Sequence, residues 1–404
     1  MTGLDTNDVT FRGRVRATLY GIAYGDAIGG PVEKLSAQEI TEKYGRVTSI
    51  NNRWHRLDED EISRNGRTRG YGIITDDTLM TICLMEVYSE VNRHIDAWDM
   101  AGPFVRKIAW EPRWIPELDK ETVLIERLFY PEKWIFHRLQ LAACDPRQGG
   151  IGNMVNCGAA MYAAPIGIVN ACDPVGAYNE AIHFMSGHQQ SYGLEAAGVF
   201  SACVAEAFRP ESCITDVLRV ALELSKDGTH DAIHIACEIA KSHEGTAWNY
   251  ESVVAELHAA MLRYSPMADD LRHGPEKAGV ATNAYQPSRL MSIEELPLAL
   301  AFCILNDGEF SKSVEDSINS GRDTDSIGIM AGAILGAMTG NSVVDTEILM
   351  HLNTANKFDI CQIADEFSAT ACSIIKADLS KEKKRRNQIK NLITGDEKVD
   401  GRGA

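Results

Sequence analysis

Apolar residues recur at intervals of three and four along most of the chain, which is the spacing of a buried face on an α-helix. The pattern is plain in residues 11–30, 76–85, 194–208 and 295–305, and helical periodicity continues through 215–264. Alternation of apolar and polar residues, which is typical of half-buried strands, is not convincing in any segment. The sequence therefore predicts an all-α fold.

Two of the predicted helices carry glycines spaced by four residues, so that the glycines share one helix face. A glycine inside a helix costs about 1 kcal/mol relative to alanine, and its repetition therefore indicates close packing against another helix backbone. The glycines are Gly21, Gly25 and Gly29 in the first helix, and Gly328, Gly332, Gly336 and Gly340 in the second. The second run is shorter than the roughly 18 apolar residues that a membrane span needs, so we expect a core helix.

Composition and charge narrow the classes of function. The chain has 404 residues with 57 acidic and 40 basic side chains, a formal net charge of −17. A broad nucleic-acid surface is not expected, because lysine and arginine dominate phosphate binding. The ten cysteines form no CxxC pair, so we expect reduced thiols in a cytoplasmic protein. The first residues contain no apolar signal segment, and no membrane partner is expected.

Two acidic clusters begin predicted helices that are far apart in the sequence. One consists of Thr75, Asp76 and Asp77, and the other of Asp323, Asp325 and Ser326. Each has a simple explanation as a helix start, where a carboxylate favours the helix dipole by about 0.3–1 kcal/mol. If the clusters meet in space, their like charges repel unless cations separate them. Carboxylate and hydroxyl oxygens select Mg²⁺ or Mn²⁺, and two such ions can hold a diol and a water together.

Other polar residues are candidates for the same site. Asp26 lies near the end of the first predicted helix and Glu33 just beyond it. Both either line a site or are ordinary polar residues at a helix exit. The glycine-rich residues 149–152 lead into a small-residue helix that we expect to end near Pro165. Backbone N–H groups in such a loop can cradle an anion.

We expect one all-α catalytic domain over residues 11–375 and a charged, flexible tail over 376–404. Within the domain, the charged segment 36–70 is expected to be mainly a solvated loop. Residues 94–149 hold four of the six tryptophans and are predicted to form short helices joined by turns. This insertion either covers one side of the site, or forms a subsidiary aromatic core or an oligomer contact. The sequence leaves the oligomeric state open.

Four stretches resemble, in the same order, the ADP-ribosylglycohydrolase family, which includes the dinitrogenase-reductase-activating glycohydrolase. They are GDAIGGPVE at 25–33, TDDTLM at 75–80, NCGAAMYAAPIG at 156–167 and GRDTDSIGIMAGAILGAMTG at 321–340. The resemblance covers roughly residues 11–340. It implies a compact, orthogonal bundle of many helices with a dinuclear Mg²⁺ or Mn²⁺ site.

Matched by position, the resemblance implies a role for each candidate residue. The implied metal ligands are Thr75, Asp76, Asp77, Asp323, Asp325 and Ser326, where the family usually has threonine at the last position. The implied catalytic residues are Glu33, Asp76 and Asp323. Asp26 is expected only to support the metal ligands, without binding the metal itself. Asn156 and Gly158 match positions that line the ADP-ribose pocket, and His188 matches a histidine at its rim.

Two departures from the family pattern concern the substrate. Arg322 stands where the family commonly has glycine, and Tyr162 where it commonly has arginine. We therefore include Tyr162 and Arg322 among the candidate substrate-binding residues, and Arg322 is suited to pair with a substrate phosphate or carboxylate.

The leading hypothesis is a metal-dependent hydrolase that cleaves the C1″ glycosidic bond of an ADP-ribosylated protein or small molecule. A hydrolase of small N-ribosyl compounds is the first alternative. A catalytically silent protein that binds ADP-ribose or a related ligand is the second. A third alternative treats the acidic clusters as helix caps in a structural protein, and it predicts no metal binding.

Overall fold

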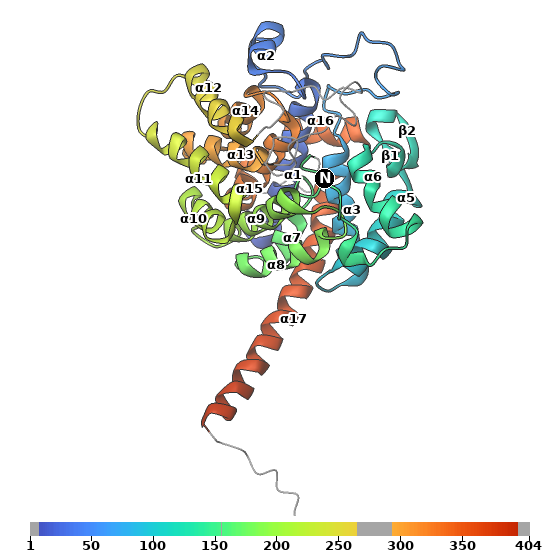
Figure 1. Cartoon of the computed structure of the whole chain (residues 1–404), viewed down its shortest axis with the longest axis vertical. Helices are drawn as coiled ribbons and strands as arrows, with labels where there is room; N and C mark the ends of the chain where they lie inside the picture. Colours follow the sequence, from blue (N-terminus) through green and yellow to red (C-terminus); the bar gives the residue numbers. More distant parts are fainter. Residues whose placement is uncertain (1–7, 155, 265–292, 395–404) are drawn as a thin grey trace, which may run out of the picture.

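The computed structural model describes residues 8–154, 156–264 and 293–394. Within them the chain forms a bundle of helices around one core, whose buried apolar residues extend from Val15 to Ile374 (Figure 1). The all-α prediction is confirmed. The α-helices are α1 (Phe11–Gly29), α2 (Ala37–Tyr44), α3 (Asp76–Val91), α4 (Ala97–Asp99), α5 (Val105–Ala109), α6 (Tyr130–Phe136), α7 (Ala164–Val169), α8 (Pro174–Met185), α9 (Ser191–Ala207), α10 (Ile214–Leu224), α11 (Asp227–Ser242), α12 (Tyr250–Met261), α13 (Glu295–Leu305), α14 (Phe310–Asn319), α15 (Thr324–Thr339), α16 (Thr346–Asn356) and α17 (Ile360–Thr394).

The two glycine faces pack against each other, so that α1 and α15 run antiparallel in the core. A Cβ atom built on Gly21 would lie 2.1 Å from the carbonyl oxygen of Gly332, and one on Gly25 would lie 2.4 Å from the carbonyl carbon of Gly328. No side chain fits in these gaps, which is why glycine occupies both faces. At the same end, a Cβ on Gly29 would lie 2.5 Å from Cα of Asp325. The close approach therefore sets the end of α1 beside the start of α15.

The structure corrects three local predictions. The 94–149 segment contains an antiparallel hairpin of β1 (Pro112–Ile115) and β2 (Lys120–Val123) that the periodicity did not reveal, because each strand has only four residues. Helix α2 lies inside the expected loop 36–70, and a capping box of Ser36 and Glu39 starts it. Pro165 lies in the first turn of α7 instead of ending a helix, since the backbone N–H that proline lacks has no partner in that turn.

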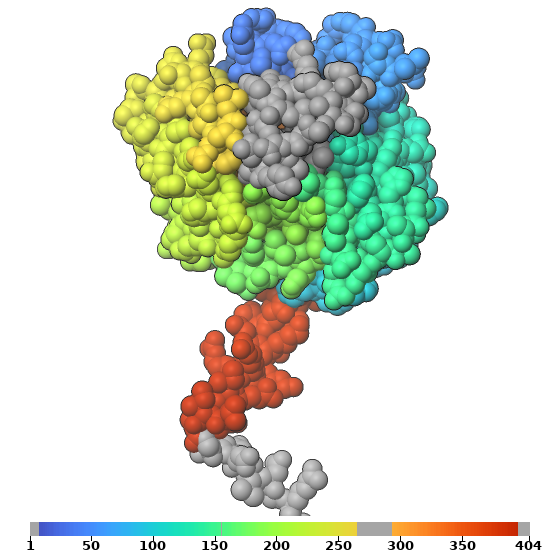
Figure 2. Space-filling view, in the orientation of Figure 1, coloured from blue at the N-terminus to red at the C-terminus, as the bar shows by residue number. Residues whose placement is uncertain are grey.

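The expected flexible tail is helical as far as the structure describes it. Helix α17 continues through the charged residues and extends away from the body of the molecule (Figures 1 and 2). Its last buried residue is Ile374, and the side chains from Lys381 to Thr394 are exposed. The expectations for 1–7 and 395–404 fall outside the described residues. Among the described helices, none combines the length and apolar character that a bilayer crossing requires.

His94 joins α17 to the body through two carboxylates. Its Nδ1 atom lies 2.5 Å from Oε2 of Glu180, and its Nε2 atom lies 2.6 Å from Oδ2 of Asp378. The hydrogen bond to Glu180, aided by that to Asp378, raises the pKa of His94 from 6.5 to about 9. The folded state thus binds this proton more tightly than the unfolded state does.

We predict that His94 stabilises the fold fully below about pH 6.5, and that this stability is lost as the pH rises through about 9. The thermal midpoint of the wild type should therefore fall more between about pH 6 and pH 10 than that of His94→Gln. Circular dichroism melts over this range test the prediction, with the exposed His183→Gln as the control. Equal pH dependence in wild type and His94→Gln would contradict it.

Candidate functional site

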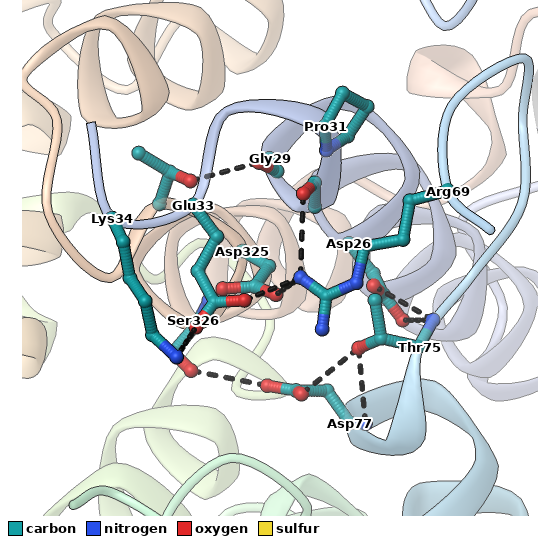
Figure 3. A network of polar contacts seen from close by, with 12 residues as sticks. Asp26, Gly29, Pro31, Glu33, Lys34, Arg69, Thr75, Asp77, Asp325 and Ser326 are labelled. Atoms are coloured by element: carbon teal, nitrogen blue, oxygen red, sulfur yellow. Dashed lines mark hydrogen bonds and ion pairs between the residues drawn. The ribbon is translucent and has the colours of Figure 1, made fainter. Parts of the chain in front are cut away.

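The two acidic clusters meet where the N-termini of α3 and α15 face each other. Thr75 is the N-cap of α3, and its hydroxyl lies 3.0 Å from Oδ2 of Asp77. From α15, the hydroxyl of Ser326 donates to Oδ1 of the same aspartate over 3.1 Å. Asp77 therefore lies between hydroxyl groups from both helices (Figure 3). The predicted meeting of the clusters is what the structure shows.

Asp26 on α1 fixes the start of α3 from behind. Its carboxylate accepts hydrogen bonds from the backbone N–H of Thr75, at 3.0 and 2.9 Å, and from the N–H and hydroxyl of Thr78. Asp26 is fully buried, and burial raises its pKa to about 6 although these hydrogen bonds act to lower it. Asp26 therefore positions Thr75 and leaves the ligand role to the residues of α3.

Glu33 reaches the α15 side of the site from the segment after α1. Carboxylate oxygens of Glu33, Asp323 and Asp325 lie within 4.8 Å of one another. The Glu33 segment is held against α15 by the backbone of Arg322, whose N–H donates to Leu35 over 2.7 Å and whose carbonyl accepts from Lys34 over 2.7 Å. These contacts bring together three residues that the sequence had predicted as ligands or catalysts.

A second group of possible ligands adjoins Asp323. A carboxylate oxygen of Glu295 and the thiol sulfur of Cys157 lie within 4.8 Å of an oxygen of Asp323 and of each other. The Cys157 thiol lies 3.3 Å from Asp323 and 3.0 Å from the hydroxyl of Ser326. Burial, then the charge of Asp323, raises the pKa of Cys157 well above its usual value. The thiol is thus a hydrogen-bond donor to Asp323.

Asp76 differs from Asp77, because its carboxylate forms an ion pair with an arginine of the chain. Arg127, from the insertion, forms an ion pair with Oδ2 of Asp76 and another with Glu117. Glu117 also accepts from Nε of Arg69 over 2.7 Å, and Arg69 pairs with Glu33. Among the described residues, the two ligand groups around Asp323 do not include Asp76. The expected ligand Asp76 is therefore engaged by a cation of the chain itself.

The electrostatics of the cluster separate Glu33 from the aspartates. Burial, followed by the charge of neighbouring carboxylates, raises the pKa of Asp77, Asp323 and Asp325. Burial also acts to raise the pKa of Glu33, but Lys34 and Arg69 hold it below its ordinary value. Glu33 is therefore ionised, whereas Asp77, Asp323 and Asp325 have too little positive charge around them to offset their burial and mutual repulsion.

Four of the candidate substrate residues form two pairs: Asn156 and Gly158 lie beside Glu132, and Tyr162 and His188 are fully buried. Asn156 donates to Oε1 of Glu132 over 2.8 Å and accepts from the N–H of Gly158 over 2.8 Å. A Cβ on Gly158 would lie 2.6 Å from the same Glu132 oxygen, so a larger residue there would displace the Glu132 carboxylate. Tyr162 and His188 are fully buried, with the tyrosine hydroxyl 2.8 Å from Nδ1 of the histidine. His188 therefore differs from the expected rim residue.

Arg322, the fifth substrate candidate, is also buried. Only 5% of its surface is exposed, and Nη1 of its guanidinium lies 4.0 Å from Oε2 of Glu294. The residue adopts a φ of 76°, a conformation that suits the glycine common in the family better than an arginine. Its role toward a substrate stays a prediction.

Comparison with known proteins decides the family. The sequence model of the family described as ADP-ribosylglycohydrolase matches residues 7–375. The chain belongs to the ADP-ribosylglycohydrolase family. The resemblance of the four motifs is confirmed, and family membership indicates glycosyl hydrolase activity.

Two relatives of this ADP-ribosylglycohydrolase family member align over most of their length. The uncharacterized protein YegU of Escherichia coli (strain K12) is 24% identical over 353 residues, covering 87% of this chain and 95% of the relative. An uncharacterized protein of Archaeoglobus fulgidus is 26% identical over 336 residues, covering 80% of this chain and 87% of the relative. The likeness thus extends over most of the chain.

The donor set of this family member fits a hard divalent cation. The side chains that converge from α3 and α15 offer carboxylate and hydroxyl oxygens, which Mg²⁺ and Mn²⁺ prefer. The repulsion that raises the pKa values of Asp77, Asp323 and Asp325 is relieved by a positive charge among them. The residues that would hold such an ion are Thr75, Asp77, Asp323, Asp325 and Ser326.

Several residues of the site escaped prediction from the sequence. They are Arg69, Glu117, Arg127, Glu132, Cys157 and Glu295. Arg69 belongs to a charged run that resembled a solvated loop, and Glu117, Arg127 and Glu132 belong to the insertion. Their charges carry no spacing signal, because they reach the site through tertiary packing. The glutamates before the apolar run of α13 were a usable signal, since carboxylates rarely begin so buried a helix without a partner.

Proposed function

We propose that this protein hydrolyses the C1″ glycosidic bond of an ADP-ribosylated protein, an ADP-ribosylated small molecule or a related N-ribosyl compound, with Mg²⁺ or Mn²⁺ as cofactor. The observation that carries the proposal is the Asp77–Ser326 contact of 3.1 Å, which joins the acidic starts of α3 and α15 into one site. Family membership supports the reaction class.

A bound Mg²⁺ or Mn²⁺ would act as a Lewis acid, which can orient the ribose hydroxyls and lower the pKa of water. The other roles fall to residues of the chain. Asp26 fixes the start of α3, so that Thr75 and Asp77 keep their positions. The carboxylates around the sugar favour the positive charge that develops on its ring in an oxocarbenium-like transition state.

We propose that Glu33 orients the attacking water by accepting a hydrogen bond from it. Lys34 and Arg69 hold the pKa of Glu33 below its ordinary value, so its carboxylate stays ionised and does not donate a proton to the leaving group. It lies within reach of Asp323 and Asp325, where the water is expected. Asn156 and Gly158 form the neighbouring wall with Glu132, and we propose that the substrate lies against it.

A cytoplasmic setting belongs to the same proposal. All ten cysteines are free, and Cys157 contacts Asp323 as a thiol. A reducing compartment preserves this thiol.

The test is a turnover screen. The full chain is incubated with Mg²⁺ or Mn²⁺ and a panel of ADP-ribosylated proteins, ADP-ribosylated small molecules and N-ribosides, and mass spectrometry detects released ribose or ADP-ribose. We expect metal-dependent release from at least one class, abolished by a chelator. Ligand binding without turnover on the whole panel would contradict the proposal and favour the silent binding protein.

A further inference from the structure

Arg69 places a permanent positive charge in the middle of the acidic site (Figure 3). Only 4% of its surface is exposed. Its Nη1 atom pairs with Glu33, lies 3.7 Å from Oδ2 of Asp325 and donates to the carbonyl of Gly30 over 3.3 Å. A guanidinium cannot lose its proton in a protein, so this charge is present at every pH of interest.

Glu117 holds Arg69 and Arg127 in place together. It is fully buried, and its two oxygens accept from Nε of Arg69 and Nε of Arg127 respectively. The pKa of Glu117 would rise on burial, but the two arginines hold it below its ordinary value. Releasing either arginine would leave an uncompensated buried charge, so Glu117 holds both guanidiniums in place.

The carboxylates of the site consequently fall into two groups. Asp76 and Glu33 are taken by guanidiniums, Asp76 by Arg127 and Glu33 by Arg69. Asp77 instead contacts the hydroxyls of Thr75 and Ser326. A hydroxyl is itself a ligand for a hard cation, whereas a guanidinium has no acceptor and repels one.

We propose that the Arg69 guanidinium, fixed by Glu117, replaces one of the two cations of the centre, so that this protein binds a single divalent ion at the Asp77, Asp323 and Asp325 side. The proposal rests on the proposed function and specifies its metal requirement. It also assigns Arg69 as a positioning residue, whose ion pair with Glu33 holds that carboxylate beside Asp323 and Asp325.

Metal counting tests the proposal without reference to activity. The full chain is dialysed against Mn²⁺, and bound metal per protein is measured by elemental mass spectrometry. A variant in which Asp77, Asp323 and Asp325 are all replaced by asparagine gives the background of surface sites. We expect one ion above background in the wild type. Two ions would overturn the proposal.

Substitution of Arg69 sharpens the test. Arg69→Met, which removes the charge but keeps the length of the side chain, is expected to raise the count from one ion to two. Arg53→Met, an exposed arginine of the same loop region, should keep one ion, and so should the charge-conserving Arg69→Lys. One ion in folded Arg69→Met would contradict the proposal. If Arg69→Met does not fold, the ion counts of the wild type and of Arg69→Lys still test the proposal, because two ions in either would overturn it.

The outcomes also separate this proposal from the proposed function. Metal-dependent turnover with two ions bound overturns only the replacement of a cation by Arg69. One ion bound without turnover on any ribosylated substrate supports the role of Arg69 and contradicts the hydrolase. A wild type without bound Mn²⁺ overturns both.

Discussion

Replacing Asp77 by asparagine is expected to lower metal-dependent turnover by at least about 100-fold, because losing merely the groups that orient metal ligands costs 10–100-fold. The substitution keeps the size of the side chain and removes its charge. In the structure, this side chain faces hydroxyls from both α3 and α15. Its loss should therefore also weaken Mn²⁺ binding, which calorimetric titration measures independently of turnover.

The matched control is Asp345→Asn at the start of α16. Asp345 caps its helix by accepting from the N–H groups of Glu347 and Ile348. Its replacement should lower stability slightly and leave Mn²⁺ affinity unchanged. Equal behaviour of the two variants would mean that the acidic clusters are helix caps, which is the structural alternative.

Gly332→Ala is expected to destabilise the fold by about 1–3 kcal/mol, which is the usual effect of overpacking a core. The added Cβ would lie 2.3 Å from the carbonyl oxygen of Gly21, so α1 and α15 must separate. The usual gain of about 1 kcal/mol for alanine in a helix is too small to compensate. Chemical denaturation should give a lower midpoint, and Mn²⁺ binding should weaken because the same helix pair positions Asp325.

Gly102→Ala serves as the control for that substitution. A Cβ at Gly102 would meet no atom within 4 Å, so the denaturation midpoint should stay unchanged or rise slightly. A midpoint for Gly332→Ala equal to that of the wild type would contradict the close contact of α1 with α15.

The sequence predicted those parts of the fold that depend on local periodicity. The spacing of the glycines predicted the close-packed faces of α1 and α15, and the acidic cluster at 75–77 predicted the start of α3; the structure confirms both. The meeting of Asp77 with Ser326 was a hypothesis about two acidic helix starts that the family resemblance supported, and the structure shows the contact. The helical course of α17 escaped because its charged residues bury no face that a periodicity could show.

The sequence did not predict that Arg69 and Arg127 belong to the site. Nothing local distinguishes Arg69 from the exposed Arg53 in the same charged run, although the first is buried against Glu33 and the second is solvated. Glu117 and Arg127 are brought to the site by the hairpin and the turns of the insertion. Their pairing depends on long-range packing, which a single sequence does not encode in a readable pattern.

The most direct test of the acidic centre is anomalous diffraction from crystals grown with Mn²⁺. The expected result is a manganese peak enclosed by Asp77, Asp323 and Asp325, between the starts of α3 and α15. A map without a peak there, from crystals in which Mn²⁺ is bound elsewhere on the protein, would contradict a metal centre at this site.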